Sequence, residues 1–365
     1  MYQNTSKEIF KMSIPMFFEL LLQLLVGNID QIMVSHYSQG SVAAIGNGNQ
    51  IMNIIILVLS SMTVATTVLI SRYFGAGDPE KAKSVSNASI YSLSFFSIVV
   101  TLLIYGFQRP LFQWLQVPTD ILDETCSYTV IVSTCVLIQA IYMVFASILR
   151  SHKLMKYVTF VAIIMNTLNI LGNAILINGL FGFPRLGIIG AAISTNISKF
   201  IGLVIIILVF LKKTNMGLGF LNLKYFSFNM AKKVLLIAVP SGGEAFSYQM
   251  SQLIILRFVN TFGTMVIASR SYCMILANIA YVYSMAISQA TQILVGYLYG
   301  KGDYESIKKR VWNSVFISMA VSVSLTVIMM FNSNMILGIF TSEQFILDLC
   351  KKILMVEIVL EVVVL

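Results

Sequence analysis

The chain of 365 residues is 58% hydrophobic and 11% charged, and its formal net charge is +9 at pH 7. A soluble domain carries about 25% charged residues, so this composition excludes a water-soluble fold. An apolar run of about 20 residues crosses a bilayer as a helix, and lipid tolerates only helices or closed barrels. The long apolar runs that recur along the chain therefore predict an all-α polytopic membrane protein.

The predicted spans are separated by short polar segments. We expect no cleavable signal sequence before the first span, because the opening apolar run is too long and lacks a small-residue cleavage site. With a cytoplasmic N-terminus, most of the 24 basic residues fall in inner segments, as the positive-inside rule requires. We predict a multi-pass protein of the plasma membrane in this orientation, in contact with the lipid bilayer and with no nucleic acid. The predicted spans cover 14–35, 43–70, 85–107, 126–148, 157–180, 187–211, 234–259, 264–297, 311–331 and 347–365.

A charged, glycine-containing loop at 71–83, SRYFGAGDPEKAK, recurs at 296–308 as GYLYGKGDYESIK. It does not predict a phosphate-binding loop, because it follows an apolar helix and lacks the GxxxxGK(S/T) pattern. Matched residues 225 positions apart begin earlier, at Pro15 and Pro240, and predict a duplicated chain. Since six spans precede the second copy, both copies have the same orientation, as in two-lobed transporters with parallel repeats.

The repeat predicts two lobes joined by a connector. Residues 1–211 form an N-terminal lobe of six spans, 212–233 a basic cytoplasmic connector, and 234–365 a C-terminal lobe of about four spans. Two complete copies would give about twelve spans, so we expect this chain to be incomplete at its C-terminus. The absence of HExxH and GxSxG patterns, with only two histidines, argues against an enzyme.

Polar side chains inside the spans are the candidate functional residues, because such groups are costly in lipid unless they face a cavity or a partner. Asp30 lies deep in the first span with no basic neighbour on its own helix, and it favours a cation or proton site. Asn166, Asn169 and Asn173 share one face of the fifth span. Their oxygens suit a hard cation such as Na⁺, although helix–helix hydrogen bonding explains them equally well.

The second lobe offers a separate candidate proton or substrate site. Glu357 and Glu361 are four residues apart on the tenth span, and two carboxylates this close favour proton uptake. Glu244 follows Pro240 by four residues and either binds a cation or stabilises a bend there. The polar residues added as cavity candidates in this lobe are Gln252, Tyr283 and Gln292.

Five blocks follow one another along the first lobe: IDQIMVSHYSQGSVAAIG, ISRYFGAGDPEKA, ILRSHKLMKY, NTLNILGNAILING and GIIGAAISTNIS. In this order, and with the second copy at GYLYGKGD, the chain resembles the multidrug and toxic compound extrusion (MATE) family. The resemblance implies about twelve helices in two lobes. It also implies export of cationic or amphipathic small molecules, driven by entry of Na⁺ or H⁺. We expect no cofactor beyond that coupling ion, and a monomer.

The resemblance also implies a first-lobe cation site. One branch of the family places an acid in the first helix, an Asn-x-x-x-Asp pair in the fifth and a Thr in the sixth. Asp30, Asn169 and Thr195 match this pattern, and Asn173 stands where the pattern has an acid. A Na⁺ site at Asp30, Asn169 and Asn173, with Thr195 beside it, is therefore one negative charge short of the pattern.

Three alternatives stay open. A lipid-linked oligosaccharide flippase of the same superfamily would need a strongly cationic cavity, whereas the embedded basic residues here are Lys199, Arg257 and Arg270. A non-transporting remnant is suggested by the shorter second lobe. A channel is less favoured, because a two-lobed repeat with embedded acids indicates alternating access.

Overall fold

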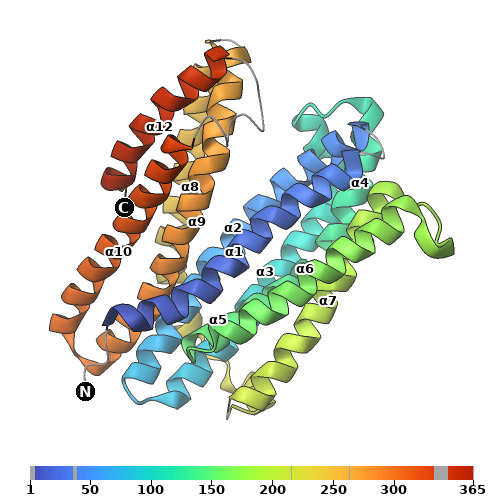
Figure 1. Ribbon diagram of the computed structural model, residues 1–365. Coiled ribbons are helices and arrows are strands. Elements are labelled where there is room, and N and C mark those ends of the chain that lie inside the picture. Colours follow the sequence, from blue (N-terminus) through green and yellow to red (C-terminus); the bar gives the residue numbers. More distant parts are fainter. Residues whose placement is uncertain (1–4, 36–38, 215, 263, 333–343, 365) are drawn as a thin grey trace. The chain divides into compact units, whose positions relative to one another are not determined.

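The computed structural model describes residues 5–35, 39–214, 216–262, 264–332 and 344–364, which are helical apart from the connecting segments (Figure 1). The prediction of an all-α chain is confirmed, and its physical reason is that a helix satisfies its own backbone in lipid. The helices are α1 (Thr5–Ser35), α2 (Gln39–Gly75), α3 (Pro79–Trp114), α4 (Thr119–Ser133), α5 (Val136–Ser151), α6 (Met155–Asn178), α7 (Gly187–Lys213), α8 (Phe228–Asn260), α9 (Thr264–Lys301), α10 (Tyr304–Phe331) and α12 (Gln344–Val364), with short 3-10 turns η1 (Leu180–Gly182), η2 (Leu218–Leu221) and η3 (Leu223–Tyr225).

Six described helical segments are long and apolar enough to cross a membrane, and the bent pair α4–α5 would make a seventh. The span predicted at 126–148 falls on this pair, and the chain bends there by 42° between α4 and α5. No proline or glycine causes this bend. Instead, Asn196 of α7 donates to the Ile131 carbonyl at 2.6 Å, and Thr101 of α3 donates to the Ser133 carbonyl at 3.0 Å. Side chains of neighbouring helices thus satisfy the freed backbone groups, which makes a bend within lipid tolerable.

The chain divides into two compact units. One contains residues 22–242, and the other contains residues 1–21 together with 243–365. Helices α1 and α8 therefore each contribute residues to both units. The division into lobes at 1–211 and 234–365, with a connector at 212–233, stays a prediction.

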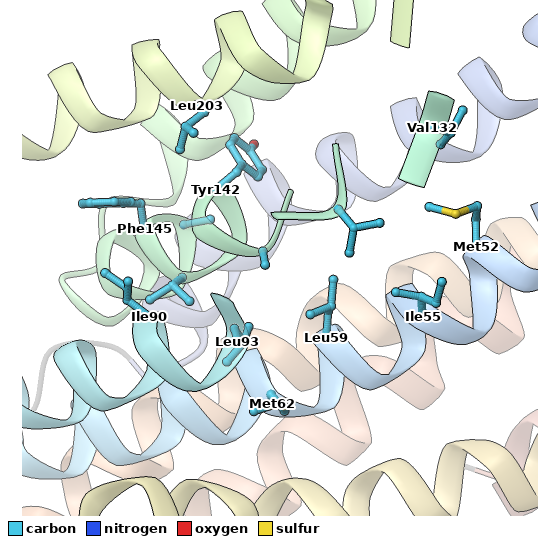
Figure 2. Close-up of a cluster of buried hydrophobic side chains, with 14 of the residues drawn as sticks. Met52, Ile55, Leu59, Met62, Ile90, Leu93, Val132, Tyr142, Phe145 and Leu203 are labelled. Carbon is cyan, nitrogen blue, oxygen red and sulfur yellow. The ribbon is translucent and has the colours of Figure 1, made fainter. Parts of the chain in front are cut away.

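The core of the unit formed by residues 22–242 is built on one face of α2. Met52, Ile55, Leu59 and Met62 are three or four residues apart, so their side chains lie along that face (Figure 2). In lipid such a face is held by close van der Waals packing, because exclusion of water contributes little between helices. The other labelled side chains of this cluster are Ile90 and Leu93 of α3, Val132 of α4, Tyr142 and Phe145 of α5, and Leu203 of α7.

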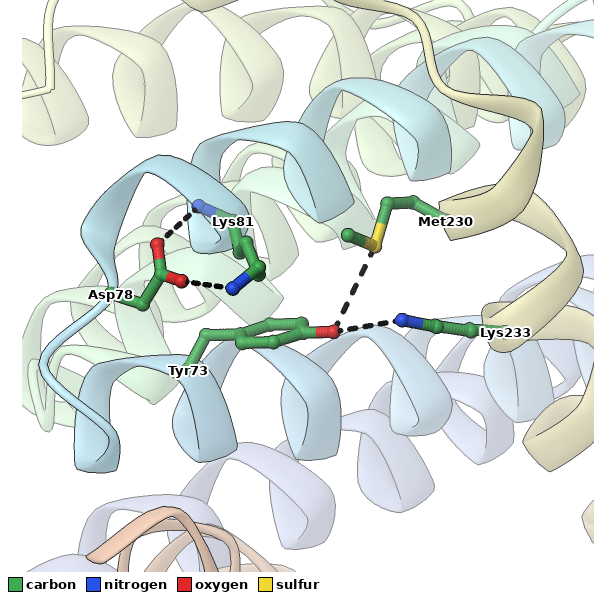
Figure 3. A network of polar contacts seen from close by, with 5 residues as sticks. All are labelled: Tyr73, Asp78, Lys81, Met230 and Lys233. Atoms are coloured by element: carbon green, nitrogen blue, oxygen red, sulfur yellow. Dashed lines mark hydrogen bonds and ion pairs between the residues drawn. The ribbon is translucent and has the colours of Figure 1, made fainter.

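The loop at 71–83 ends in a helix cap. Asp78 is the N-cap of α3: its carboxylate accepts a hydrogen bond from the backbone N–H of Lys81 at 3.0 Å and pairs with the Lys81 ammonium group (Figure 3). These hydrogen bonds lower the pKa of Asp78. Gly77 has φ of +71°, a conformation that glycine adopts without the cost of a Cβ clash.

The matching loop at 296–308 has the same construction. Asp303 is the N-cap of α10 and accepts from the backbone N–H of Ser306 at 3.1 Å, while Gly302 has φ of +76°. Each loop is a tight turn that starts the following helix. The repeated residues are explained by helix capping and by turn geometry.

Tyr73, close to the end of α2, joins this region to the first turns of α8. Its hydroxyl accepts a hydrogen bond from the Lys233 ammonium at 3.3 Å and donates to the Met230 sulfur at 3.8 Å (Figure 3). The Lys81 ammonium lies 6.0 Å from the centre of the Tyr73 ring. The start of α8 is thereby fixed against the end of α2.

In the other unit, α9 packs against α10 and α12. Ser284 of α9 shares a hydrogen bond of 2.8 Å with Ser322 of α10, and Thr291 donates to Ser314 at 2.7 Å. Small hydroxyl residues let two helices approach closely while they satisfy one another in lipid. The hydroxyl residues buried at every fourth position of α10 are Ser314, Ser318, Ser322 and Thr326.

Candidate functional site

The candidate cation site lies where α6 and α7 pack closely together. A Cβ atom at Gly190 of α7 would lie 2.6 Å from the carbonyl oxygen of Leu176. A Cβ at Gly172 of α6 would lie 2.4 Å from the Ser194 hydroxyl oxygen, which can move by rotation of its side chain. The backbone contact at Gly190 therefore requires glycine for the helices to approach to this distance, and the polar groups between them are shielded from lipid.

The asparagine face of α6 is turned toward this contact. Asn169 and Asn173, one helical turn apart, are both buried. The Asn169 amide donates to the Thr195 hydroxyl of α7 at 3.1 Å, and Ser194 donates to the Asn169 backbone carbonyl at 2.9 Å. The amide nitrogen of Asn166, which is partly exposed, has no hydrogen-bond partner among the described residues.

Three of the four residues predicted for the first-lobe site thus lie on the adjoining helices α6 and α7. Asn169 and Thr195 are in direct contact, and Asn173 lies one turn further along the same face. They supply amide and hydroxyl oxygens, which are hard ligands of the kind that Na⁺ binds. All three are neutral, so the charge of a bound cation would have to be balanced by another residue.

Asp30, the predicted source of that charge, belongs to α1. Its side chain lies outside the described part of the structure. Nearby on the same helix, Val34 is fully buried in the core of the unit formed by residues 22–242, and Met33 packs against that core. In the described part of the chain, no group of three or more histidine, cysteine, aspartate or glutamate residues could hold a metal ion.

The residues predicted for the second lobe have separate surroundings. Gln252 accepts a hydrogen bond from the Arg270 guanidinium at 3.2 Å, and the Tyr283 ring packs edge-on against Phe17 at 5.5 Å. Glu244 is exposed on α8. The Gln252–Arg270 contact gives one of the three embedded basic residues a neutral partner.

Two further predicted positions of this lobe, Glu357 and Glu361, are part of α12, but their side chains lie outside the described residues. Gln292 is partly buried in α9. Whether these groups form a proton or substrate site stays a prediction.

Several polar contacts inside the unit of residues 22–242 were not expected from the sequence. Tyr128 donates to the Asn49 side chain at 3.0 Å, and Ser41 donates to the Glu124 carboxylate at 3.1 Å. Asn196, the residue after Thr195, bonds to the bend between α4 and α5. The sequence signal for this last contact is Asn196 itself, because an asparagine side chain in a spanning helix needs a hydrogen-bond partner.

Comparison with known proteins places the whole chain in one group. The family model MatE matches residues 15–175 and 240–365, so the matched regions begin at Pro15 and at Pro240, its partner in the repeat. The uncharacterized transporter YisQ of Bacillus subtilis is 32% identical over 353 residues, which are 97% of this chain and 78% of YisQ. The probable multidrug resistance protein NorM of Thermotoga maritima is 26% identical over 94% of this chain and 74% of its own length.

A solved structure has the same fold. It is an outward-facing multidrug resistance MATE family transporter, which matches 99% of this chain and 80% of its own chain with a TM-score of 0.86 at 22% identity. The similarity at this level of identity concerns the course of the helices.

Proposed function

The chain belongs to the MatE family of membrane transporters, and on that premise we propose that it exports cationic or amphipathic small molecules in exchange for Na⁺ or H⁺. It is a multi-pass transporter and not an enzyme. The name of the Thermotoga relative as a multidrug resistance protein supports export of foreign compounds. A lipid-linked sugar flippase has less support, because Arg270 already has Gln252 as a partner and Arg257 is exposed.

The observation that carries the proposed coupling is the partly buried contact between Asn169 of α6 and Thr195 of α7. Oxygen ligands held on two closely packed helices form a small polar site in an apolar environment. We assign Asp30 as the charged ligand, with Asn169, Asn173 and Thr195 as the neutral ones. A carboxylate in such an environment is strongly disfavoured until a cation or a proton neutralises it.

That penalty is what couples the ion to the movement. In the state that opens the site to water, the ionised carboxylate is tolerated, and in the closed packing it is not. An ion that binds the carboxylate shifts the population toward the closed packing by its differential affinity for the two states. Drug export follows when the two states also open to opposite sides of the membrane.

We also propose that the transporter acts as a monomer in the cell membrane with its N-terminus in the cytoplasm. The distribution of basic residues supports this orientation, since most lie in segments that it places inside. Inner arginines and lysines resist translocation during insertion and so fix the topology.

The test is transport of a fluorescent cationic dye in proteoliposomes that contain this chain, with a Na⁺ gradient and a pH gradient imposed in turn. We expect one gradient to accelerate export and Asp30→Asn to abolish the acceleration. Asn169→Leu should weaken the apparent affinity for the effective ion about tenfold, since one ligand to a charged group is lost. Export by Asp30→Asn that still responds fully to the gradient would overturn the proposal.

Asn178 provides the matched control. It lies at the exposed end of α6, and its amide bonds only within its own helix, to the Ala174 carbonyl at 3.3 Å. Asn178→Leu should leave the response to both gradients unchanged. Equal losses in Asn178→Leu and Asn169→Leu would indicate a general effect of removing asparagine from α6.

A further inference from the structure

The segment between α7 and α8 is tied to α3 by buried polar groups. The side-chain amide of Asn87, which is fully buried, donates to the backbone carbonyls of Phe220 at 2.5 Å and Asn222 at 3.2 Å. The Tyr91 hydroxyl donates to the Leu221 carbonyl. Phe220 itself is buried, with its ring 5.8 Å from that of Phe210 in α7. Hydrogen bonds from α3 to three backbone carbonyls, and the packing of the Phe220 ring against α7, therefore fix the positions of η2 and η3.

The outward side of the same segment is apolar. Leu223 is 68% exposed, Tyr225 is 62% exposed and Phe228, at the start of α8, is 79% exposed. A segment anchored by its own backbone does not need these side chains for its fold. The exposed side chains follow α7, a candidate membrane span that ends at Lys213, within 15 residues along the chain. Aromatic and aliphatic side chains at a membrane edge enter the boundary between headgroups and acyl chains.

The charge of the segment has one sign only. Between positions 212 and 233 there is no aspartate or glutamate, and there are five lysines. Lys233 is engaged with Tyr73, and the Lys213 ammonium lies 5.0 Å from the centre of the Tyr157 ring. Four of the five lysines are exposed and flank the apolar side chains along the chain: Lys212, Lys213, Lys224 and Lys232.

We propose that this segment, 212–228, is a binding surface for acidic phospholipid headgroups of the cytoplasmic leaflet. Lysine ammonium groups pair with phosphodiester oxygens, and each lysine near an anionic membrane surface adds about 1 kcal/mol of attraction. Leu223, Tyr225 and Phe228 anchor the segment by insertion beside the headgroups. The rigid anchoring on α3 lowers the entropy lost on binding, because the surface is already ordered. The cytoplasmic placement rests on the orientation proposed above.

The presence of exposed lysines together with exposed apolar side chains favours lipid over an acidic protein segment as the ligand. Exposed lysines that alternate along the chain with exposed apolar side chains, following a candidate membrane span, match the layered chemistry of a membrane surface.

The experiment measures retained lipid and needs no transport. The full chain is reconstituted in vesicles of equal parts phosphatidylcholine and phosphatidylglycerol and extracted in mild detergent, and the phospholipid that co-purifies is quantified by mass spectrometry. We expect phosphatidylglycerol to be enriched on the unaltered chain. In the triple variant Lys212→Gln, Lys213→Gln, Lys224→Gln the preference should fall by roughly fivefold for each lysine removed.

A charge-matched variant on the other repeat is the control: Lys301→Gln, Lys308→Gln, Lys309→Gln, three exposed lysines beside the loop at 296–308. It should keep the full preference. Equal losses in both triple variants would overturn the proposal in favour of a general charge effect.

Two further arms make the result specific. Tyr225→Ser with Phe228→Ser should lower the amount of both lipids retained while the preference for phosphatidylglycerol persists. Binding of polyglutamate that depends on the same three lysines, without lipid enrichment, would overturn the assignment in favour of an acidic protein partner. The Asp30 variants test transport separately, so either proposal can fail alone.

Discussion

The helix pair α2–α3 and its copy α9–α10 are joined by the same hydrogen bond at the same relative position. Thr66 and Ser89 share a bond of 2.8 Å, and Thr291 donates to Ser314 at 2.7 Å, each residue 225 positions after its counterpart. Both copies begin their second helix with a capping aspartate after a left-handed glycine. Duplication has kept the groups that start the second helix and fasten it to the first.

The copies differ in the charge that they bury. Val85 of α3 is fully buried in an apolar core, whereas its counterpart on α10 is Arg310, which is 9% exposed. The Arg310 guanidinium lies 3.6 Å from the Glu8 carboxylate of α1. The same backbone plan therefore accommodates an apolar contact in one copy and an ion pair in the other, and the side chain that faces this position decides which is tolerated.

Placing the arginine of the second copy at the matching position of the first copy should have the largest effect on the stability of the fold. Val85→Arg places a charge without a designed partner in a packed core, which costs about 4 kcal/mol or more. We expect little folded protein after extraction in detergent, measured by size-exclusion chromatography. Val85→Met, which adds length without charge, is the control and should fold with a lower melting temperature. Normal yield of Val85→Arg would show that this position is as open to charge as position 310.

Breaking the ion pair should have a moderate effect. Arg310→Met removes the guanidinium that pairs with the partly exposed Glu8 carboxylate, and we expect a loss of about 1–2 kcal/mol, less than for a fully buried pair because water reaches Glu8. Thermal unfolding in detergent measures it. Adding Glu8→Gln to Arg310→Met should recover part of the loss, giving a coupling energy of about 1 kcal/mol. Strictly additive effects of the two substitutions would mean that the pair contributes nothing.

Removing the shared hydroxyl pair compares the copies directly. Thr66→Val should lose about 1–2 kcal/mol, because the buried Ser89 hydroxyl loses its partner. Thr291→Val should lose less, since Thr291 is partly exposed and water can replace it. Thr67→Val is the control, because the Thr67 hydroxyl bonds only within α2, to the Thr63 carbonyl. A loss in Thr67→Val as large as in Thr66→Val would remove the link between the repeat and the bond.

The sequence predicted those features that depend on local pattern. The composition predicted the helices, the spacing of asparagines predicted the polar face of α6, and the repeat predicted the paired loops. The offset of 225 relates Thr66 to Thr291 and Ser89 to Ser314, but it does not predict that each threonine bonds to the serine of the next helix. Side-chain partners on other helices depend on packing that no local pattern contains.

Two features show where that limit lies. The bend between α4 and α5 contains neither proline nor glycine, and it is stabilised by Asn196, more than 60 residues away. Asn87 and Tyr91 hold a segment about 130 residues further along the chain. The Asn169–Thr195 contact followed from the family resemblance, because spacing alone left open whether the asparagines bind an ion or another helix.

The smallest expected difference between the copies concerns acid. Hydrogen bonds from the Lys81 side chain and backbone lower the pKa of Asp78 below its ordinary value of 3.8. A carboxyl whose pKa is lower in the folded state stabilises the fold above its unfolded pKa, and this contribution is lost as the pH falls through the folded pKa. The counterpart of Lys81 in the second copy is Ser306, which donates its backbone N–H to the cap and carries no charged side chain. Lys81→Ser should therefore make the melting temperature of the protein depend less on pH in the acid range. The effect is small because the pair is exposed to water.

Lys83→Ser, which breaks the neighbouring pair with Glu80, is the control and should leave the titration of Asp78 unchanged, as measured by melting temperature against pH. An unaltered acid dependence in Lys81→Ser would mean that the backbone N–H alone sets the pKa of Asp78, and the two caps would then be equivalent in charge as well as in geometry.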